Sequence, residues 1–132
     1  MATTSSELHE RDQLPHFDVT TLDGRRVRYD ELWQRRNLVL ILTDPQKRQE
    51  ATVFASQLSA RQEEFGDAET AVVVTSDSVP GFRAPCVVIA DRWGEIMHLE
   101  AITSGDTSPR PTVDELLDWV RFARIQCPEC PP

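Results

Sequence analysis

The chain has 132 residues, of which 39% are hydrophobic and 27% charged, so it suits a single globular domain with one core. A net charge of −8 disfavours nucleic acid or an anionic membrane as a partner, since both select for a positive surface. The longest apolar run, 38–42, is far shorter than the roughly 18 residues that a membrane-spanning helix needs.

The N-terminal residues 1–13 are predicted to form a flexible leader. They show no apolar periodicity and lack the basic and apolar regions of a secretory signal. The chain holds three cysteines, Cys86, Cys127 and Cys130, which are too few for a secreted disulfide scaffold. Both observations favour a cytoplasmic protein.

A β-hairpin is predicted at residues 16–29. Apolar residues alternate there on both sides of Asp23-Gly24, a pair that is typical of a tight turn in which both residues adopt positive φ. Asp30 is then expected to cap a short helical turn that runs through Trp33. The folded part of the chain therefore opens with two short antiparallel strands.

A buried strand followed by a helix is predicted next. The continuous apolar run 38–42 fits a strand that is covered on both faces. Asp44 at the cap and Pro45 in the first turn predict a helix start, and apolar residues continue at helical spacing to Phe65. Gly66 is the expected stop, and the helix should lie on the sheet.

Three shorter strands and a final helix complete the pattern. The strands are expected at 71–75, 85–90 and 95–101. A loop rich in Gly, Ser and Pro follows at 104–111, after which a capping box of Thr112 and Glu115 should open the last helix. The apolar stripe of this helix consists of Val113, Leu116, Leu117, Val120 and Ala123.

Four segments, taken in order, carry a family resemblance. They are Leu14-Pro15-His16-Phe17 with Leu22-Asp23-Gly24-Arg25, then 32–42, then 84–91 with Gly94 and Ile96, and finally 111–125. Together they resemble the redoxin branch of the thioredoxin superfamily, related to the alkyl hydroperoxide reductase and thiol-specific antioxidant proteins. The resemblance implies an α/β thioredoxin-like fold over residues 14–126, with a central mixed β-sheet flanked by helices and an N-terminal β-hairpin. It also implies a cis peptide bond at Pro85, facing the active site.

The sequence departs from this family where the reactive cysteine is expected. In redoxins that cysteine follows the first core strand and lies at a helix N-terminus, where the helix dipole stabilises a thiolate. Residues 43–48 contain neither cysteine nor serine, so conventional peroxidase chemistry is not expected there. The helix that the family places between the second and third core strands is also reduced to residues 76–84, which are too few for a regular crossover helix.

Residues 127–132 form a separate tail that contains Cys127-Pro128-Glu129-Cys130. Two cysteines separated by two residues can close a disulfide, exchange with a substrate disulfide or supply half of a tetrahedral zinc site. The pair follows a helix C-terminus, and Glu129 adds like charge, so its position tells against an activated thiolate. Zinc would need two more ligands, which a symmetric dimer could supply by pairing two tails.

One hypothesis is that the chain is a redoxin-like protein with a degenerate active site. Residual thiol–disulfide oxidoreductase activity would then reside in the tail, with Cys127 or Cys130 attacking and the other resolving. The partner would be a protein or a thiol substrate. No cofactor is required, and zinc is the one metal that these two cysteines suggest.

Two alternatives stay open. The chain could be a non-catalytic binding module that holds a protein partner in the thioredoxin groove, or a homodimer tethered by zinc through its tails. The groove residues would be Asp44, Pro45, Ala84, Pro85 and Cys86. Cys86 also has a simpler interpretation, as a small hydrophobe packed in a buried strand. The sequence leaves open whether the chain is an enzyme.

Overall fold

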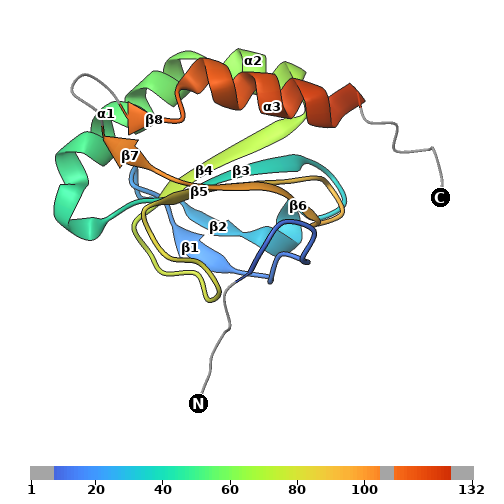
Figure 1. Ribbon diagram of the computed structural model, residues 1–132, viewed down its shortest axis with the longest axis horizontal. Helices are drawn as coiled ribbons and strands as arrows, with labels where there is room; N and C mark the ends of the chain where they lie inside the picture. The colour runs from blue at the N-terminus through green and yellow to red at the C-terminus, as the bar shows by residue number, and fades with distance from the viewer. Residues whose placement is uncertain (1–7, 105–108, 126–132) are drawn as a thin grey trace.

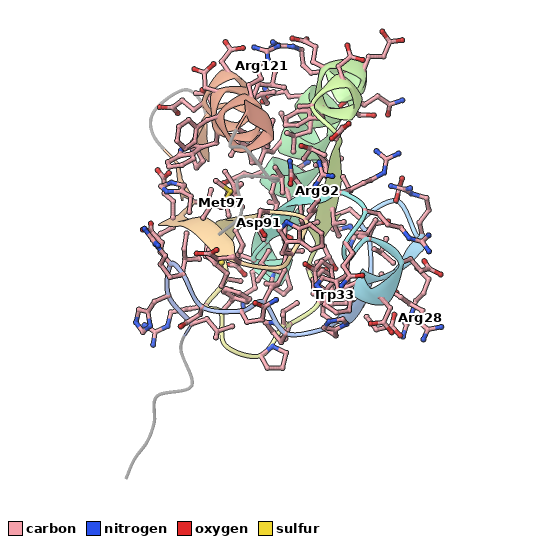
Figure 2. The ribbon with its side chains drawn as sticks, turned by 90° about the vertical axis from the view of Figure 1, so that its right-hand side faces the viewer. Arg28, Trp33, Asp91, Arg92, Met97 and Arg121 are labelled. Atoms are coloured by element: carbon pink, nitrogen blue, oxygen red, sulfur yellow. The ribbon has the colours of Figure 1, made fainter. Side chains whose placement is uncertain are left out.

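A computed structural model of the chain describes residues 8–104 and 109–125. The predicted tail at 127–132 and the first part of the predicted leader lie outside these residues. Figure 1 shows three layers, with the helices on one side of a central sheet and the N-terminal hairpin on the other. Figure 2 shows the same layers from the side, with Arg121 in the helical layer and Arg28 and Trp33 on the hairpin side.

The central sheet has four strands in the order β4-β3-β5-β6. β3 (Asn37–Leu42) pairs in parallel with β4 (Thr70–Thr75) and antiparallel with β5 (Cys86–Ala90), which in turn pairs antiparallel with β6 (Ile96–Ala101). Every residue of β3 and β5 is buried, because both of their faces are covered. The predicted mixed sheet and its strands are therefore confirmed.

The predicted long helix after β3 is divided into shorter pieces. A 3-10 helix, η2 (Pro45–Lys47), leads into α1 (Arg48–Ala60), and α2 (Gln62–Asp67) follows. Arg61 interrupts the helix with φ −113° and ψ 19°. In α2, which follows this interruption, Phe65 packs in the core at 1% exposure.

Gly66 is therefore not the helix stop that was predicted. It lies inside α2 (Gln62–Asp67), and the helix ends one residue later. The backbone NH of Ala68 closes this end by donating to the carbonyls of Glu64 and Phe65. The helix thus ends through backbone hydrogen bonds and not through the conformational freedom of glycine.

The N-terminal hairpin is confirmed, but its turn differs from the prediction. β1 (Asp18–Thr20) and β2 (Arg26–Arg28) pair antiparallel and are joined by residues 21–25, a longer link than a two-residue turn. Gly24 has φ +90°, whereas Asp23 does not have a positive φ. Within this link, Thr21 bridges to Thr75 and attaches the hairpin to β4, which is an edge strand of the central sheet.

Asp30 does not cap the helical turn that follows the hairpin. The turn is a 3-10 helix, η1 (Tyr29–Glu31), whose N-terminal flank at Arg28 has no side-chain cap. The Asp30 carboxylate instead contacts the ring of His16 and forms an ion pair with Arg28. The turn is held by Tyr29, which is fully buried and stacks on Phe17 with ring centroids 5.1 Å apart.

Two apolar cores lie on the two faces of the sheet. The core on the hairpin side includes Leu14, Phe17, Val19, Tyr29, Leu38, Leu40, Val79 and Cys86. The core on the helical side includes Val39, Ile41, Phe54, Leu58, Phe65, Val87, Leu116, Leu117 and Val120. Residues of β3 alternate between the two cores, as expected for successive side chains of a strand.

Residues 76–85, between β4 and β5, form no helix, as the sequence predicts. Their Val79 is buried in the hairpin-side core, and Phe82 packs against it. Residues 8–13 also contribute to this side of the molecule, since the NH of Leu8 donates to the carbonyl of Gly81 and Gln13 bridges to Glu95. Extended segments thus cover the sheet face where a crossover helix is missing.

The turn between β5 and β6 matches the Asp-x-x-Gly pattern of the resemblance. An Asp91 carboxylate oxygen accepts hydrogen bonds from the NH groups of Trp93 and Glu95, at 2.9 and 3.0 Å. Gly94 has φ +87°, and a side chain there would collide with Gln13. Glycine is favoured at this turn by its backbone conformation, because Gln13 contacts the position only with the end of a flexible side chain.

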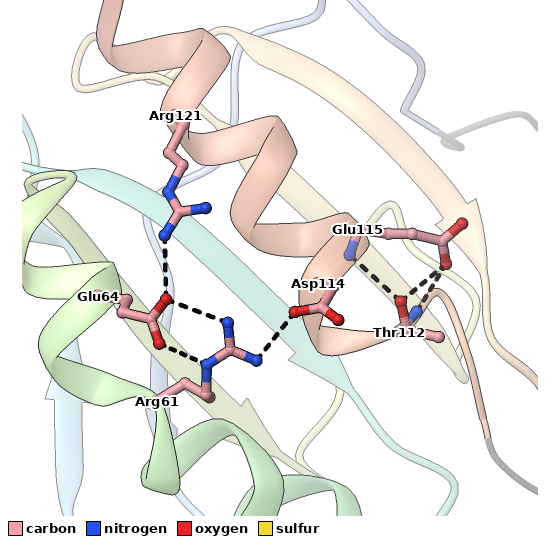
Figure 3. A network of polar contacts seen from close by, with 6 residues as sticks. All are labelled: Arg61, Glu64, Thr112, Asp114, Glu115 and Arg121. Atoms are coloured by element: carbon pink, nitrogen blue, oxygen red, sulfur yellow. Dashed lines mark hydrogen bonds and ion pairs between the residues drawn. The ribbon is translucent and has the colours of Figure 1, made fainter.

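The predicted loop at 104–111 includes a short ladder. β7 (Thr103–Ser104) pairs antiparallel with β8 (Pro109–Arg110), and α3 (Val113–Ile125) follows. The capping box is confirmed (Figure 3): Thr112 Oγ1 accepts from the NH of Glu115, and Glu115 Oε1 accepts from the NH of Thr112 at 2.8 Å.

Charged side chains join the helices over the sheet. Arg61, at the break between α1 and α2, pairs with Glu64 of α2 and donates to Asp114 of α3 at 2.9 Å. Arg121 of α3 reaches back to Glu64 at 3.0 Å (Figure 3). The break at Arg61 therefore places one guanidinium between two helices.

Candidate functional site

The candidate site lies at the corner where β3 gives way to helix. Beyond the end of β3, Thr43 continues its ladder, with its NH donating to the carbonyl of Thr75 at 2.8 Å. Asp44 then accepts a hydrogen bond from the NH of Gln46 at 2.9 Å, and Pro45 occupies the first helical position. The predicted cap and proline are thus in place, and they turn the chain sharply off the sheet.

The cis-proline faces this corner, as the resemblance implies. The bond between Ala84 and Pro85 is cis, and the Pro85 carbonyl accepts from the NH of Ile102 at 3.1 Å. A cavity of about 70 Å³ separates the corner from the proline. Its lining includes Thr43, Asp44, Lys47, Phe54, Pro85 and Ile102.

The structure brings together some of the predicted groove residues and separates one. Asp44 and Pro85 line the cavity, whereas Pro45 and Ala84 are exposed beside it and are not among its lining residues. Cys86 points away, into the hairpin-side core, where it is 4% exposed. The prediction that Cys86 belongs to the groove is therefore wrong, and its interpretation as a packed small hydrophobe holds.

The environment of Cys86 suppresses its reactivity. Cys86 is the first residue of β5. Because successive side chains of a strand point to opposite faces of the sheet, Val87 belongs to the helical-side core and Cys86 to the hairpin-side core. Burial raises the pKa of the Cys86 thiol to about 11, because the charged thiolate is poorly solvated there. Among the residues that the structure describes it is the only cysteine, so the groove has no thiol nucleophile from this part of the chain.

The groove offers groups that bind rather than attack. Thr43 is buried, and its hydroxyl donates to the carbonyl of Thr75 at 3.1 Å, so its proton is directed at a carbonyl oxygen and not at a general base. Asp44, Lys47 and Glu50 place charges around an apolar floor that includes Phe54. Such a lining favours recognition of a side chain by shape and charge.

Some residues that line the groove were not predicted from the sequence. Glu50 and Phe54 follow the corner at helical spacing, so the pattern of α1 contained a signal for them. Ile102 enters the groove from the segment after β6, far along the chain, and no local pattern indicates it. Its position depends on the antiparallel register of β5 with β6.

Over residues 8–104 and 109–125, His, Cys, Asp and Glu side chains form no cluster of three or more that could hold a metal ion. Cys127 and Cys130, to which the catalytic and zinc hypotheses refer, lie outside this part of the chain. None of the described helices is long and apolar enough to cross a membrane.

Comparison with solved structures defines the fold. A reduced 2-Cys peroxiredoxin of Plasmodium vivax matches with a TM-score of 0.65 and 12% identity, over 87% of this chain and 96% of that one. AhpC of Mycobacterium tuberculosis matches with 0.60 and 16%, over 88% and 98%. A putative thiol:disulfide interchange protein DsbE from Chlorobium tepidum matches with 0.59 and 13%, over 89% and 99%.

The chain therefore has an α/β thioredoxin-like fold of the peroxiredoxin type, as predicted. No family model and no curated relative matches the sequence. At these identities the similarity defines the arrangement of the backbone.

Proposed function

We propose that this chain is a thioredoxin-fold binding protein that holds an extended segment of a partner protein at its corner groove without covalent chemistry. One observation carries the proposal: the groove between Asp44 and Pro85 is present, but its lining has charged and apolar side chains in place of a thiol. The fold's usual position for partner contact is thus retained without its nucleophile.

The geometry supports an extended segment as the ligand. Ala84 is exposed at the rim and precedes the first ladder residue of β5, Cys86, so backbone next to the groove is accessible to a partner strand. The cavity of about 70 Å³ has room for one small side chain of such a segment. Lys47 and Asp44 at the rim would then select for charge on its neighbours.

A peptide selection tests this proposal. Peptides would be selected from a displayed library against the full chain, and their affinities measured for Lys47→Ala and for Arg48→Ala. Both variants remove one positive charge, but only Lys47 lines the groove, whereas Arg48 does not. We expect weaker binding for Lys47→Ala alone. Equal affinities for the two variants, or no selected peptide, would contradict binding at the corner.

The second candidate function is thiol–disulfide exchange through the tail, which the Cys127-x-x-Cys130 motif favours. One thiolate would attack a substrate disulfide and form a mixed disulfide, and the other would resolve it, leaving an oxidised pair and a reduced substrate. Dithiothreitol would then reduce the pair again. The partner would be a protein disulfide or a small thiol substrate.

Reduction of insulin by dithiothreitol distinguishes the two candidates. Exchange predicts acceleration by the wild-type chain that is lost in Cys127→Ser and Cys130→Ser. Binding without chemistry predicts that the chain does not accelerate insulin reduction. It also predicts that a variant in which both tail cysteines are serine still binds the selected peptides. Native mass spectrometry of the same samples reports the zinc-tethered dimer as a doubled mass with bound zinc.

A further inference from the structure

α3 carries a second stripe beside the one that it buries. Its core stripe includes Leu116, Leu117 and Val120. A second set at positions i, i+3, i+4 and i+7 lines a groove of about 440 Å³ together with Glu100 of β6. This second stripe consists of Glu115, Asp118, Trp119 and Phe122.

The aromatic rings of this stripe are partly open to solvent. Phe122 is 48% exposed, although a ring of this size is normally buried. Trp119 packs edge-to-face with Phe122, with centroids 6.2 Å apart, and stacks on His98 of β6 at 4.3 Å. His98 does not line the groove, so it supports Trp119 from outside it. Exposed aromatic side chains at the edge of a groove mark a surface for interaction.

The charges that line the groove are all negative. Glu100 accepts from His98 at 2.8 Å, Glu115 forms the capping box with Thr112, and Asp118 is exposed. A guanidinium fits this lining better than an ammonium, because its planar face stacks on aromatic rings while its edge donates to carboxylates. The lining therefore complements arginine in both charge and shape.

We propose that this groove, the α3–β6 groove, binds an arginine side chain carried by an extended segment of a partner protein. Glu115 and Phe122 lie seven residues apart, so the stripe is roughly 10 Å long, which matches about three extended residues. The chain's own C-terminal residues carry Glu129 and no basic residue after Ile125, so they do not complement the groove. A second copy carries the same net charge of −8, which disfavours it as the occupant of an acidic groove.

Titration with a matched pair of peptides tests the proposal. One peptide is acetyl-Gly-Arg-Gly-Arg-Gly-amide, and the other replaces both arginines with citrulline, which has the same shape but no charge. NMR shifts of the Trp119 indole NH and of the α3 backbone would be followed in low salt. We expect shifts with the arginine peptide that weaken with added salt, and none with the citrulline peptide.

Variants locate the binding. Phe122→Leu should lower the affinity for the arginine peptide roughly 2- to 5-fold, the range expected for an exposed cation–π contact. Asp118→Asn should also lower it, whereas Asp67→Asn, which removes an equal charge from an exposed position at the end of α2, should not. Lys47→Ala should leave it unchanged, which separates this groove from the corner groove.

Several results would overturn the proposal. Equal binding of the two peptides would show that charge recognition is absent. Equal effects of Asp118→Asn and Asp67→Asn would show non-specific attraction to an acidic chain. A dimer in analytical ultracentrifugation that Phe122→Leu dissociates would identify a second copy as the occupant instead.

Discussion

The two faces of the central sheet are covered by different kinds of structure. The helices α1, α2 and α3 cover one face, and contacts of Arg61, Glu64 and Arg121 join α2 to α3 (Figures 1 and 3). The other face is covered by the hairpin and extended segments, which pack through Tyr29 and Phe17. A fully apolar strand such as β3 requires cover on both faces, and here the hairpin side supplies it without a helix.

The two sides of the sheet also differ in where reactive groups can reach solvent. The corner groove and the α3–β6 groove both border the helical side, where charged side chains reach solvent at helix surfaces. The hairpin side holds Cys86, but in a core that keeps its thiol neutral. A cysteine next to the cis-proline is therefore not a redox centre when the strand directs it to the wrong face.

The largest expected effect tests the hairpin side. Tyr29→Ala removes a fully buried ring from that core and should lower the free energy of unfolding by about 3–5 kcal/mol. Urea denaturation at neutral pH measures it. A loss below about 1 kcal/mol would show that the hairpin is not an integral cover of the sheet.

Tyr29→Phe is the matched control, because it keeps the ring. The Tyr29 hydroxyl is buried without a hydrogen-bond partner among the described residues, so its removal should not destabilise the protein. Burial raises the pKa of Tyr29 to about 12, so the wild-type chain should lose stability as the pH rises from about 10 to 12. Tyr29→Phe should lack this alkaline loss, and an unchanged alkaline limb would contradict the assignment.

The next largest effect is expected on the helical side of the sheet, where α3 packs. Leu117 lies on the buried face of α3 and is 1% exposed, so Leu117→Ala should cost about 2–5 kcal/mol. The neighbouring exposed change Asp118→Asn serves as the control and should be close to neutral. If Leu117→Ala were as mild as the control in urea denaturation, α3 would not be a structural layer.

A smaller effect is expected at the corner. Asp44→Ala removes the acceptor for the NH of Gln46 and should cost about 1 kcal/mol. Asp44→Asn keeps an acceptor oxygen and should restore most of this stability. Thermal unfolding of both variants measures the difference. Equal losses would mean that the charge of Asp44, and not its hydrogen bond, stabilises the helix start.

The smallest effect concerns the ion pairs of the helical side. Hydrogen bonds from Arg61, together with Arg121, hold the pKa of Glu64 below its usual value. This contribution is present above the pKa of an unfolded glutamate and is lost as the pH falls through the lower, folded value. Glu64→Gln should therefore flatten the acid limb of the thermal midpoint against pH.

Glu63→Gln provides the control for this pH profile. Glu63 is exposed on the same helix and lies outside the contacts drawn in Figure 3. Its replacement should leave the acid limb as steep as in the wild type. If Glu63→Gln flattened the limb as much as Glu64→Gln, the acid sensitivity would reflect net charge and not the joined helices.

Local patterns were enough for the elements whose stability is local. Three features could be predicted from the sequence because each depends on neighbouring residues: the apolar run of β3, the cap at Asp44, and the capping box of Thr112 and Glu115. The break in the helix at Arg61 could not be predicted in this way. The break accompanies two long-range features that no local pattern indicates: Arg61 contacts Asp114, 53 positions along the chain, and Phe65 is buried in the core.

The sequence by itself determined the order of the elements, the missing thiol at the corner and the lack of a crossover helix, since these depend on residue types and short-range spacing. Only the tertiary structure decided which face of the sheet each side chain joins. Cys86 was directed into the hairpin-side core, and Ile102 was brought to Pro85. Such contacts are set by strand register and by the packing of the layers, which bring together residues that are far apart in the sequence and share no local pattern.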